Sequence, residues 1–325
     1  MLQQTRVETV IPHYIRFLAR FPTLRHLARA SLEQVLAHWS GLGYYRRARS
    51  LHAGARKVLE EHGGEFPRDM ERALEIPGVG PYTAAAVLSI AYNIPLPVVD
   101  GNVERVLTRL LRIRGKVNSA MAVKKLRALA ARAMPEGRAS EFNQALMELG
   151  AIVCTPSNPD CAACPLAGSC AAHRTGEESR FPERPQQRPF VSITIEVGII
   201  RRGDLCLFER VEEGSFLRGL WLFPFREASD PRPSGPSRTF LGALERALGA
   251  RIRSSRLVAN VRHAITFRRI TAEVYLLEPR DFEPSEGKDA RRASCGKKFR
   301  WARLEDLGRT LPTSSLTLKI ARLLG

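Results

Sequence analysis

Four cysteines fall within seventeen consecutive residues, and this cluster constrains the fold more than any other feature of the sequence. They are Cys154, Cys161, Cys164 and Cys170, with six, two and five residues between them. Such spacing lets a single loop wrap one small centre with four thiolates. Zinc sites usually place two close pairs of ligands on separate turns, so the uneven spacing favours an iron–sulfur centre over zinc. Because a chain with only six cysteines cannot be a disulfide scaffold, we expect a metal in a reducing compartment.

The sequence before this cluster has helical periodicity, with apolar residues recurring every three and four positions up to about residue 150. Ser31-Leu32-Glu33-Gln34 predicts a capping box at the start of one helix. Pro81 suits the first position of another helix, which is expected to run to Tyr92. Further helices are predicted over residues 44–62, 103–112, 120–133 and 141–153. The first half of the chain is therefore predicted to be all-α.

The sequence after the cluster changes in character, because a segment rich in charge and proline is followed by alternating, β-branched residues. The latter predict a hairpin of strands 191–200 and 205–210, further strands over 257–261, 267–277 and 299–302, helices over 239–248 and 315–324, and loops over 231–237 and 284–296. We predict an all-α domain over 1–172 that includes the cluster loop 154–170, a linker over 173–190, and a smaller α+β domain over 191–325.

The net charge is strongly positive. The 325 residues include 51 Lys and Arg against 33 Asp and Glu, a net +18, and 44% of the residues are hydrophobic, which is enough to build folded cores. A folded basic protein most often meets a polyanion. No apolar run approaches the roughly 18 residues that a membrane helix needs, and the first residues lack a secretory signal. We therefore expect a monomer in the cytoplasm with no membrane partner.

Two short motifs carry candidate chemistry. Glycines in Ile76-Pro77-Gly78-Val79-Gly80 allow a tight turn between two helices, whose backbone N–H groups and following helix start can grip a phosphate. Asp100, in Asp100-Gly101-Asn102-Val103, places a carboxylate at the start of a further helix. Each motif also has a plain interpretation, since the turn can be a simple helix corner and the aspartate can be a residue favoured by the helix dipole.

Six segments together resemble the MutY family of adenine DNA glycosylases, within the helix-hairpin-helix glycosylase superfamily. They are Leu2-Gln3-Gln4-Thr5, Gly41-Leu42-Gly43-Tyr44-Tyr45-Arg46, the glycine turn, the Asp100 motif, Phe142-Asn143-Gln144-Ala145 and the four-cysteine loop. The resemblance covers residues 1 to about 172. Two later segments, Gly219-Leu220-Trp221-Leu222-Phe223-Pro224 and Val261-Arg262-His263, resemble more weakly the family's C-terminal NUDIX-like domain. A NUDIX box is not found there, so nucleotide hydrolysis by this domain is not expected.

The resemblance implies an enzyme of base excision repair that removes adenine mispaired with 8-oxoguanine or guanine from double-stranded DNA, near the nucleoid of a bacterium. The adenine is flipped out of the helix before its glycosidic bond is cut. Asp100 then faces an oxocarbenium-like sugar, and Tyr82 and Asn102 line the site. Bifunctional relatives carry a lysine where this chain has Tyr82, so strand cleavage is not expected. The four cysteines are implied to hold a [4Fe–4S] cluster.

The resemblance also implies residues that contact DNA. Gln4 and Tyr44 match residues that wedge into the base stack around 8-oxoguanine. The other implied contacts are Thr5, Arg46 and the hairpin residues Gly78, Val79 and Gly80. Where the family often has Phe-Ser-His to sense 8-oxoguanine, this chain has Ile265-Thr266-Phe267. Thr266 retains the hydroxyl, although the segment also fits a plain strand with alternating faces.

The sequence departs from the family at its start. The family's general acid is a glutamate just upstream of the Leu-Gln-Gln-Thr segment, and this chain begins at Met1. Neither Glu8 nor Glu33 takes that role by motif. We favour a misplaced start over a fragment that binds mispairs without cutting, and expect little glycosylase activity from the chain as written.

Two further functions compete with this one. Strand cleavage by a bifunctional glycosylase is disfavoured by Tyr82, which stands where such enzymes carry a lysine. A redox sensor built on the cysteine cluster would leave the glycine turn and Asp100 without a role.

Overall fold

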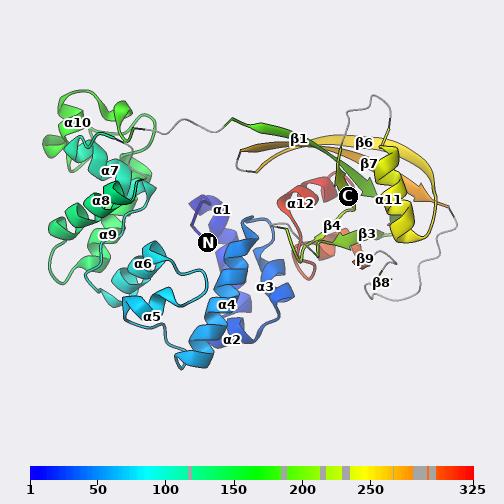
Figure 1. Ribbon diagram of the computed structural model, residues 1–325, viewed down its shortest axis with the longest axis horizontal. Coiled ribbons are helices and arrows are strands. Elements are labelled where there is room, and N and C mark those ends of the chain that lie inside the picture. The colour runs from blue at the N-terminus through cyan, green and yellow to red at the C-terminus, as the bar shows by residue number, and fades with distance from the viewer. Residues whose placement is uncertain are drawn as a thin grey trace. The chain divides into compact units, whose positions relative to one another are not determined.

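The structure is a computed structural model that describes residues 1–115, 119–183, 189–212, 217–228, 235–265, 267–280, 291–292 and 298–325. The chain forms two compact units (Figure 1). Unit 1 combines Met1–Leu59 with Arg188–Gly325, and unit 2 is Glu60–Gln187. These units do not follow the division predicted along the sequence, because the first helices group with the strand-rich part.

Unit 1 begins with four helices: α1 (Val7–Arg20), α2 (Leu24–Arg29), α3 (Leu32–Trp39) and α4 (Tyr45–Glu61). The predicted capping box is confirmed at α3, where the Ser31 side chain accepts from the Gln34 backbone and the Gln34 side chain accepts from the Ser31 backbone. Thr23 caps α2 in a similar way by accepting from the His26 N–H. Local polar side chains therefore fix where these helices begin.

The remainder of unit 1 is an α+β arrangement of two sheets. The first sheet has the order β5 (Phe225–Glu227), β1 (Val191–Ile199), β7 (Arg268–Pro279), β6 (Ile252–Ile265), and the second has β2 (Arg201–Arg202), β3 (Leu205–Arg210), β9 (Lys298–Arg303), β8 (Arg291–Arg292), with β4 (Trp221–Leu222) beside β3. The helices are α11 (Arg238–Leu248), the short η4 (Leu304–Asp306) and α12 (Ser315–Ala321). Side chains from both sheets and α12 share one core, which includes Val197, Phe208 and Ile320.

The predicted hairpin of 191–200 with 205–210 is corrected by the pairing of these strands. β1 runs parallel to β7 in the first sheet, whereas β3 pairs with the two residues of β2 and with β9 in the second. The chain passes from one sheet to the other near Ile200, so β1 and its expected partner lie in different layers. The predicted loops over 231–237 and 284–296 fall mostly outside the described residues.

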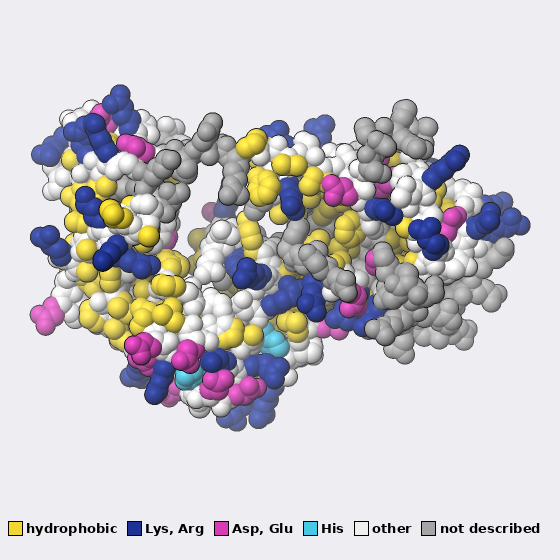
Figure 2. Space-filling model, viewed as in Figure 1, with side chains coloured by type: hydrophobic (Ala, Val, Ile, Leu, Met, Phe, Trp, Pro, Cys, Tyr) yellow, Lys and Arg dark blue, Asp and Glu magenta, His cyan; other side chains and the backbone are white. Residues whose placement is uncertain are grey.

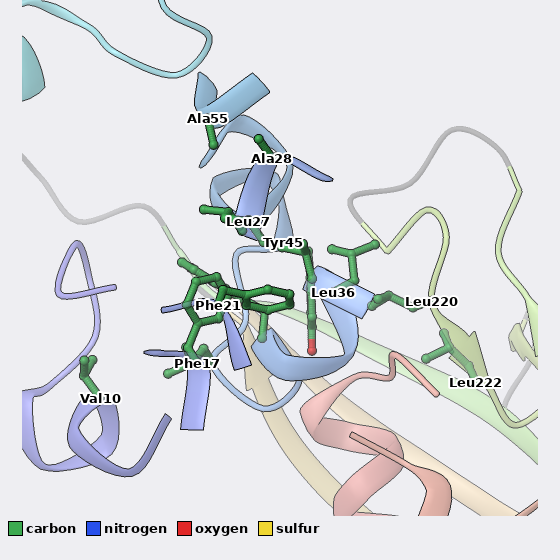
Figure 3. Close-up of a cluster of buried hydrophobic side chains, with 14 residues drawn as sticks. Val10, Phe17, Phe21, Leu27, Ala28, Leu36, Tyr45, Ala55, Leu220 and Leu222 are labelled. Carbon is green, nitrogen blue, oxygen red and sulfur yellow. The ribbon is translucent and has the colours of Figure 1, made fainter. Parts of the chain in front are cut away.

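The first helices and the C-terminal part of unit 1 share a second hydrophobic core. Leu36 of α3 packs with Leu220 and Leu222, which lie almost two hundred residues later (Figure 3), and Trp39 belongs to the same cluster. The Trp221 indole N–H also donates to the Glu33 carboxylate at 3.0 Å. Burial of apolar area contributes roughly 25 cal/mol per Å² to stability, so the packing of these large side chains helps to hold the two parts of unit 1 together.

Unit 2 is helical. Its elements are α5 (Met70–Leu74), α6 (Pro81–Tyr92), α7 (Gly101–Leu111), α8 (Ala120–Ala133), α9 (Ala139–Glu148), a π-helix η1 (Leu149–Val153), and the short η2 (Ala167–Ser169), α10 (Ala171–Arg174) and η3 (Glu178–Arg180). The helix predicted over 141–153 thus changes to a π-helix in its last turn. The start of the predicted linker is folded instead, because α10 and η3 lie in it and Phe181 is buried. Arg109 holds this segment by donating to the carbonyls of Glu178 and Phe181.

Two surface properties bear on function. Lys and Arg side chains are spread over both units in the view of Figure 2 rather than gathered in one patch. Across the part of the chain that the structure describes, no helix is long and apolar enough to cross a membrane.

Candidate functional site

The glycine turn joins α5 to α6 as predicted. Gly78 has φ +82°, a left-handed conformation that side chains rarely adopt, and the next residue, Val79, donates its N–H to the Ile76 carbonyl at 3.0 Å. Gly80 caps α6 with φ −93°, and a Cβ placed there would meet nothing within 4 Å. Gly78 is therefore needed for the turn itself, whereas at Gly80 the protein leaves open space beside the N-terminus of α6.

Asp100 is the N-cap of α7. One of its carboxylate oxygens accepts from the backbone N–H groups of Asn102 at 2.9 Å and Val103 at 2.8 Å, and the other faces the Asn102 side-chain amide at 3.3 Å. The residue is only partly buried. The predicted position at a helix start is confirmed, and the capping bonds fix the carboxylate in one orientation.

Tyr82, in the first turn of α6, interacts electrostatically with this carboxylate. Burial raises the pKa of the Tyr82 phenol, and the charge of Asp100 raises it further. Its hydroxyl approaches the Met147 sulfur at 4.0 Å. Burial and Asp100 likewise raise the pKa of Glu104, one turn along α7. The structure thus brings together Tyr82, Asp100 and Asn102, the three residues predicted to line the catalytic site.

Arg105 supports this group through buried hydrogen bonds, and sequence reasoning did not identify the residue. The residue is 8% exposed and donates to the Asn102 side-chain oxygen at 2.9 Å, the Gly150 carbonyl at 2.6 Å and the Cys154 carbonyl at 2.7 Å. A single buried guanidinium therefore connects the start of α7 with the start of the cysteine loop. Hydrogen bonds from a charged donor are among the stronger ones in proteins.

Gly150 in the π-helix explains how η1 lies so close to α7. A Cβ added at Gly150 would lie 2.7 Å from the Asn102 Cβ and 2.9 Å from its backbone carbon. Only glycine allows this approach. π-Helical turns are rare and occur frequently at functional sites, and this one presses against a predicted site residue.

Asn143 orders the segment that leads to Asp100. It is fully buried, accepts from the Val98 N–H at 3.0 Å and donates to the Leu96 carbonyl at 2.9 Å. The side-chain amide thereby pairs one backbone donor and one backbone acceptor of a segment that belongs to no helix or strand. Asn143 belongs to a segment that the resemblance singled out, but its role appears only in the folded chain.

The four predicted ligand cysteines line one pocket. They are free thiols, and short turns connect them, with Cys164 donating its N–H to the Cys161 carbonyl and Cys170 beginning α10. Four thiol donors around one pocket fit an iron–sulfur cluster. Arg109, buried on α7, donates to the Cys154 sulfur at 3.4 Å and suits the negative charge of such a group.

The predicted wedge residues lie in unit 1. Both Gln4 and Tyr44 have left-handed backbone, with φ 61° and 47°, and Tyr44 is 43% exposed. Arg47 connects the two segments that carry these residues. Its guanidinium donates to the Met1 carbonyl and the Thr5 hydroxyl, and lies 5.1 Å from the Tyr44 ring centre. Sequence reasoning did not reveal this role of Arg47.

Two further residues were predicted to contact DNA. Arg46 is exposed at the start of α4. Thr266, the predicted sensor of 8-oxoguanine, lies outside the described residues, between the ends of β6 and β7.

Comparison with known proteins relates two parts of the chain to families of base excision repair. Residues 1–132 match the family described as HhH-GPD superfamily base excision DNA repair protein, and residues 154–170 match the iron-sulfur binding domain of endonuclease III. The helical part of the chain thus carries the helix-hairpin-helix domain of base excision repair proteins, and its cysteine loop is a [4Fe–4S]-binding site.

The relatives of the chain are adenine DNA glycosylases. That of Rattus norvegicus is 50% identical over 208 residues, 64% of this chain and 40% of the relative; that of Buchnera aphidicola from Schizaphis graminum is 34% identical over 224 residues, 69% and 65% respectively. A solved thermostable thymine-DNA glycosylase is 30% identical with a TM-score of 0.48, covering 54% of this chain and 80% of its own. On the evidence of its sequence relatives the chain is MutY-like, and it spans 40% of the rat relative's length.

Proposed function

We propose that the chain is an adenine DNA glycosylase of base excision repair, which hydrolyses the N-glycosidic bond of adenine paired with 8-oxoguanine or guanine in double-stranded DNA. The observation that carries this proposal is the group formed by Tyr82, Asp100 and Asn102 at the N-terminal ends of α6 and α7. Support comes from the adenine DNA glycosylases that are its relatives.

Asp100 has the central role in the proposed reaction. As the bond between the sugar and adenine breaks, positive charge grows on the sugar, and a fixed carboxylate stabilises that charge. Asn102 and Val103 hold the carboxylate through their N–H groups, so it is oriented before substrate arrives. Arg105 keeps Asn102 in place through its side-chain oxygen.

Tyr82 makes the proposed enzyme monofunctional. A bifunctional glycosylase attacks the sugar with an amine to form a Schiff base, which then leads to strand cleavage. A phenol with a raised pKa stays neutral and protonated at physiological pH and forms no Schiff base. Water is then the nucleophile, and the product is an intact strand with an abasic site.

Binding of DNA is assigned to both units. In unit 2, the hairpin at Gly78–Gly80 offers open backbone beside the N-terminus of α6, where a phosphate is favoured. In unit 1, Gln4 and Tyr44 wedge into the base stack around 8-oxoguanine, and Arg46 contacts a phosphate. The cluster, when bound, ties the four cysteines together through iron–thiolate bonds. The α+β part is proposed to be NUDIX-like and to read 8-oxoguanine, with Thr266 as a contact.

The test is single-turnover release of adenine from a duplex with one A:8-oxoguanine pair. We expect Asp100→Asn to lose at least about 100-fold in rate, the lower end for a catalytic carboxylate. Asp69→Asn is the matched control, because Asp69 also caps a helix of unit 2 by accepting a backbone N–H, and it should stay within twofold of the parent.

Two further readouts separate this enzyme from its competitors. Strand breaks should appear only after alkali, and breaks without alkali would favour the strand-cleaving enzyme. Slow release by the parent agrees with the low activity expected from the sequence, whereas a parent chain that binds the mispair but releases no adenine would contradict the enzymatic part of the proposal and leave a mispair-binding protein.

A further inference from the structure

The turn that presents Tyr44 is built from unusual backbone. Gly41, Gly43 and Tyr44 have φ values of 95°, 70° and 47°. Glycine adopts such values readily, but a bulky aromatic residue does so at a cost of order 1–3 kcal/mol, and persists there only when its surroundings impose it. The contacts around this turn therefore show what holds Tyr44 in place.

Those contacts come from the other end of the chain. The neighbouring tyrosine, Tyr45, is 3% exposed, and its hydroxyl donates to the Thr313 carbonyl at 2.6 Å. The N–H of Thr313 donates to the Ser40 hydroxyl at 2.9 Å. One residue of the C-terminal segment thus grips the turn on both sides, at Ser40 before it and at Tyr45 after it.

Thr313 is itself fixed. It is fully buried, its hydroxyl donates to the Trp221 carbonyl at 2.7 Å, and the N–H of Trp221 donates to the Pro312 carbonyl at 2.8 Å. Tyr45 also packs in the core that includes Leu220 and Leu222, as Figure 3 shows. The support of the turn is therefore buried and hydrogen-bonded, while Tyr44 remains 43% exposed.

We propose that Tyr45 and Thr313 are positioning residues, through which the C-terminal part of unit 1 sets the orientation of Tyr44 for mispair recognition. The inference rests on the proposed function, since it assigns Tyr44 the wedge role. Its new content is that the C-terminal part acts on recognition through the protein, besides any contact it makes with DNA. Loss of the Tyr45 hydroxyl, which bonds Thr313, is then expected to weaken mispair recognition by Tyr44.

The experiment uses the full chain and a double-mutant cycle. Affinity for an A:8-oxoguanine duplex and for a matched A:T duplex is measured by fluorescence anisotropy at one salt concentration, and their ratio is the readout. We expect Tyr45→Phe to reduce the ratio about three- to tenfold, as the loss of one buried hydrogen bond allows. In a Tyr44→Ala background the same change should have no further effect.

Tyr275→Phe is the matched control. Tyr275 is equally buried in unit 1, and its hydroxyl bonds Glu273 at 2.8 Å, within the first sheet rather than under the turn. It should leave the ratio within twofold of the parent. An equal loss in Tyr275→Phe, or an undiminished loss from Tyr45→Phe in the Tyr44→Ala background, would overturn the inference.

A readout without DNA keeps this test separate from the proposed function. Amide hydrogen exchange of residues 40–47 should quicken in Tyr45→Phe and stay unchanged in Tyr275→Phe. A parent chain without mispair preference would refute the proposed function, and the exchange result alone would then decide whether Tyr45 holds the turn. Unchanged exchange in Tyr45→Phe overturns the positioning role in either case.

Discussion

The start of α7 and the turn before α4 are supported in opposite ways. Asp100 accepts hydrogen bonds from the next residues of its own helix, and its neighbours Val98 and Arg105 bond to the segment 143–154, which follows within about fifty positions. Tyr44 is held by a segment near residue 313. The proposed catalytic group is therefore supported by nearby sequence, whereas the proposed recognition residue depends on both ends of the chain having folded together.

Replacing Arg105 by Met should have the largest effect on stability. The change tests how strongly α7 is held to the segment 143–154. The change leaves the Gly150 and Cys154 carbonyls without their charged donor, so we expect a loss of about 3 kcal/mol or more in unfolding free energy. Urea unfolding and the visible absorbance of the loaded cluster measure it. Arg132→Met, on an exposed position of α8, is the control; equal losses in both variants would remove the distinction between the two regions.

Gly150→Ala should come next, because its Cβ would overlap Asn102. Overpacking of this kind typically costs about 1–3 kcal/mol, and here we expect the upper end, with slower adenine release because Asn102 must move. Gly168→Ala is the comparison, since a Cβ there meets nothing within 4 Å. Full activity in Gly150→Ala would mean that the close approach of η1 does not matter to the site.

The pH dependence of Tyr45 tests the long-range side of the comparison. Burial raises the pKa of this phenol from 10.0 to about 12, so the folded state holds the proton more tightly than the unfolded state. The stability this provides is complete below pH 10 and is lost as the pH rises from 10 to 12, by on the order of 2 kcal/mol.

Urea unfolding of the parent and of Tyr45→Phe between pH 9 and 12 measures this effect. The gap in stability between them should shrink by that amount across the interval, because the variant has no proton to lose. A constant gap would show that Tyr45 is not buried in the way the turn requires.

Much of the fold was open to prediction because its signals are local. Helix α6 and helix α8 begin and end where Pro81, Tyr92 and the apolar spacing indicated, and the capping box at Ser31 formed as expected. Capping and periodicity depend on residues three or four apart, so they can be read without knowing the rest of the chain. The cysteine spacing belongs to the same class.

The pairing of elements was harder to predict. The hairpin expected for β1 failed because the strand signal of alternation says which residues form a strand but not which sheet it joins. The start of the expected linker is folded because Arg109, far back on α7, meets carbonyls in it. The charged and proline-rich composition of residues 173–190 does not reveal that Arg109 will bond to them.

The groups that supply the chemistry of this protein can be read in the sequence: an aspartate at a helix start, Asn102 two residues later, Tyr82, and four thiols in one loop. Which residues hold those groups in place depends on how distant parts of the chain pack together. Arg105, Asn143 and Thr313 act through buried hydrogen bonds between groups that lie 45 to 268 positions apart. A backbone carbonyl or N–H is present at almost every position, so no residue pattern marks the one that a distant side chain will meet.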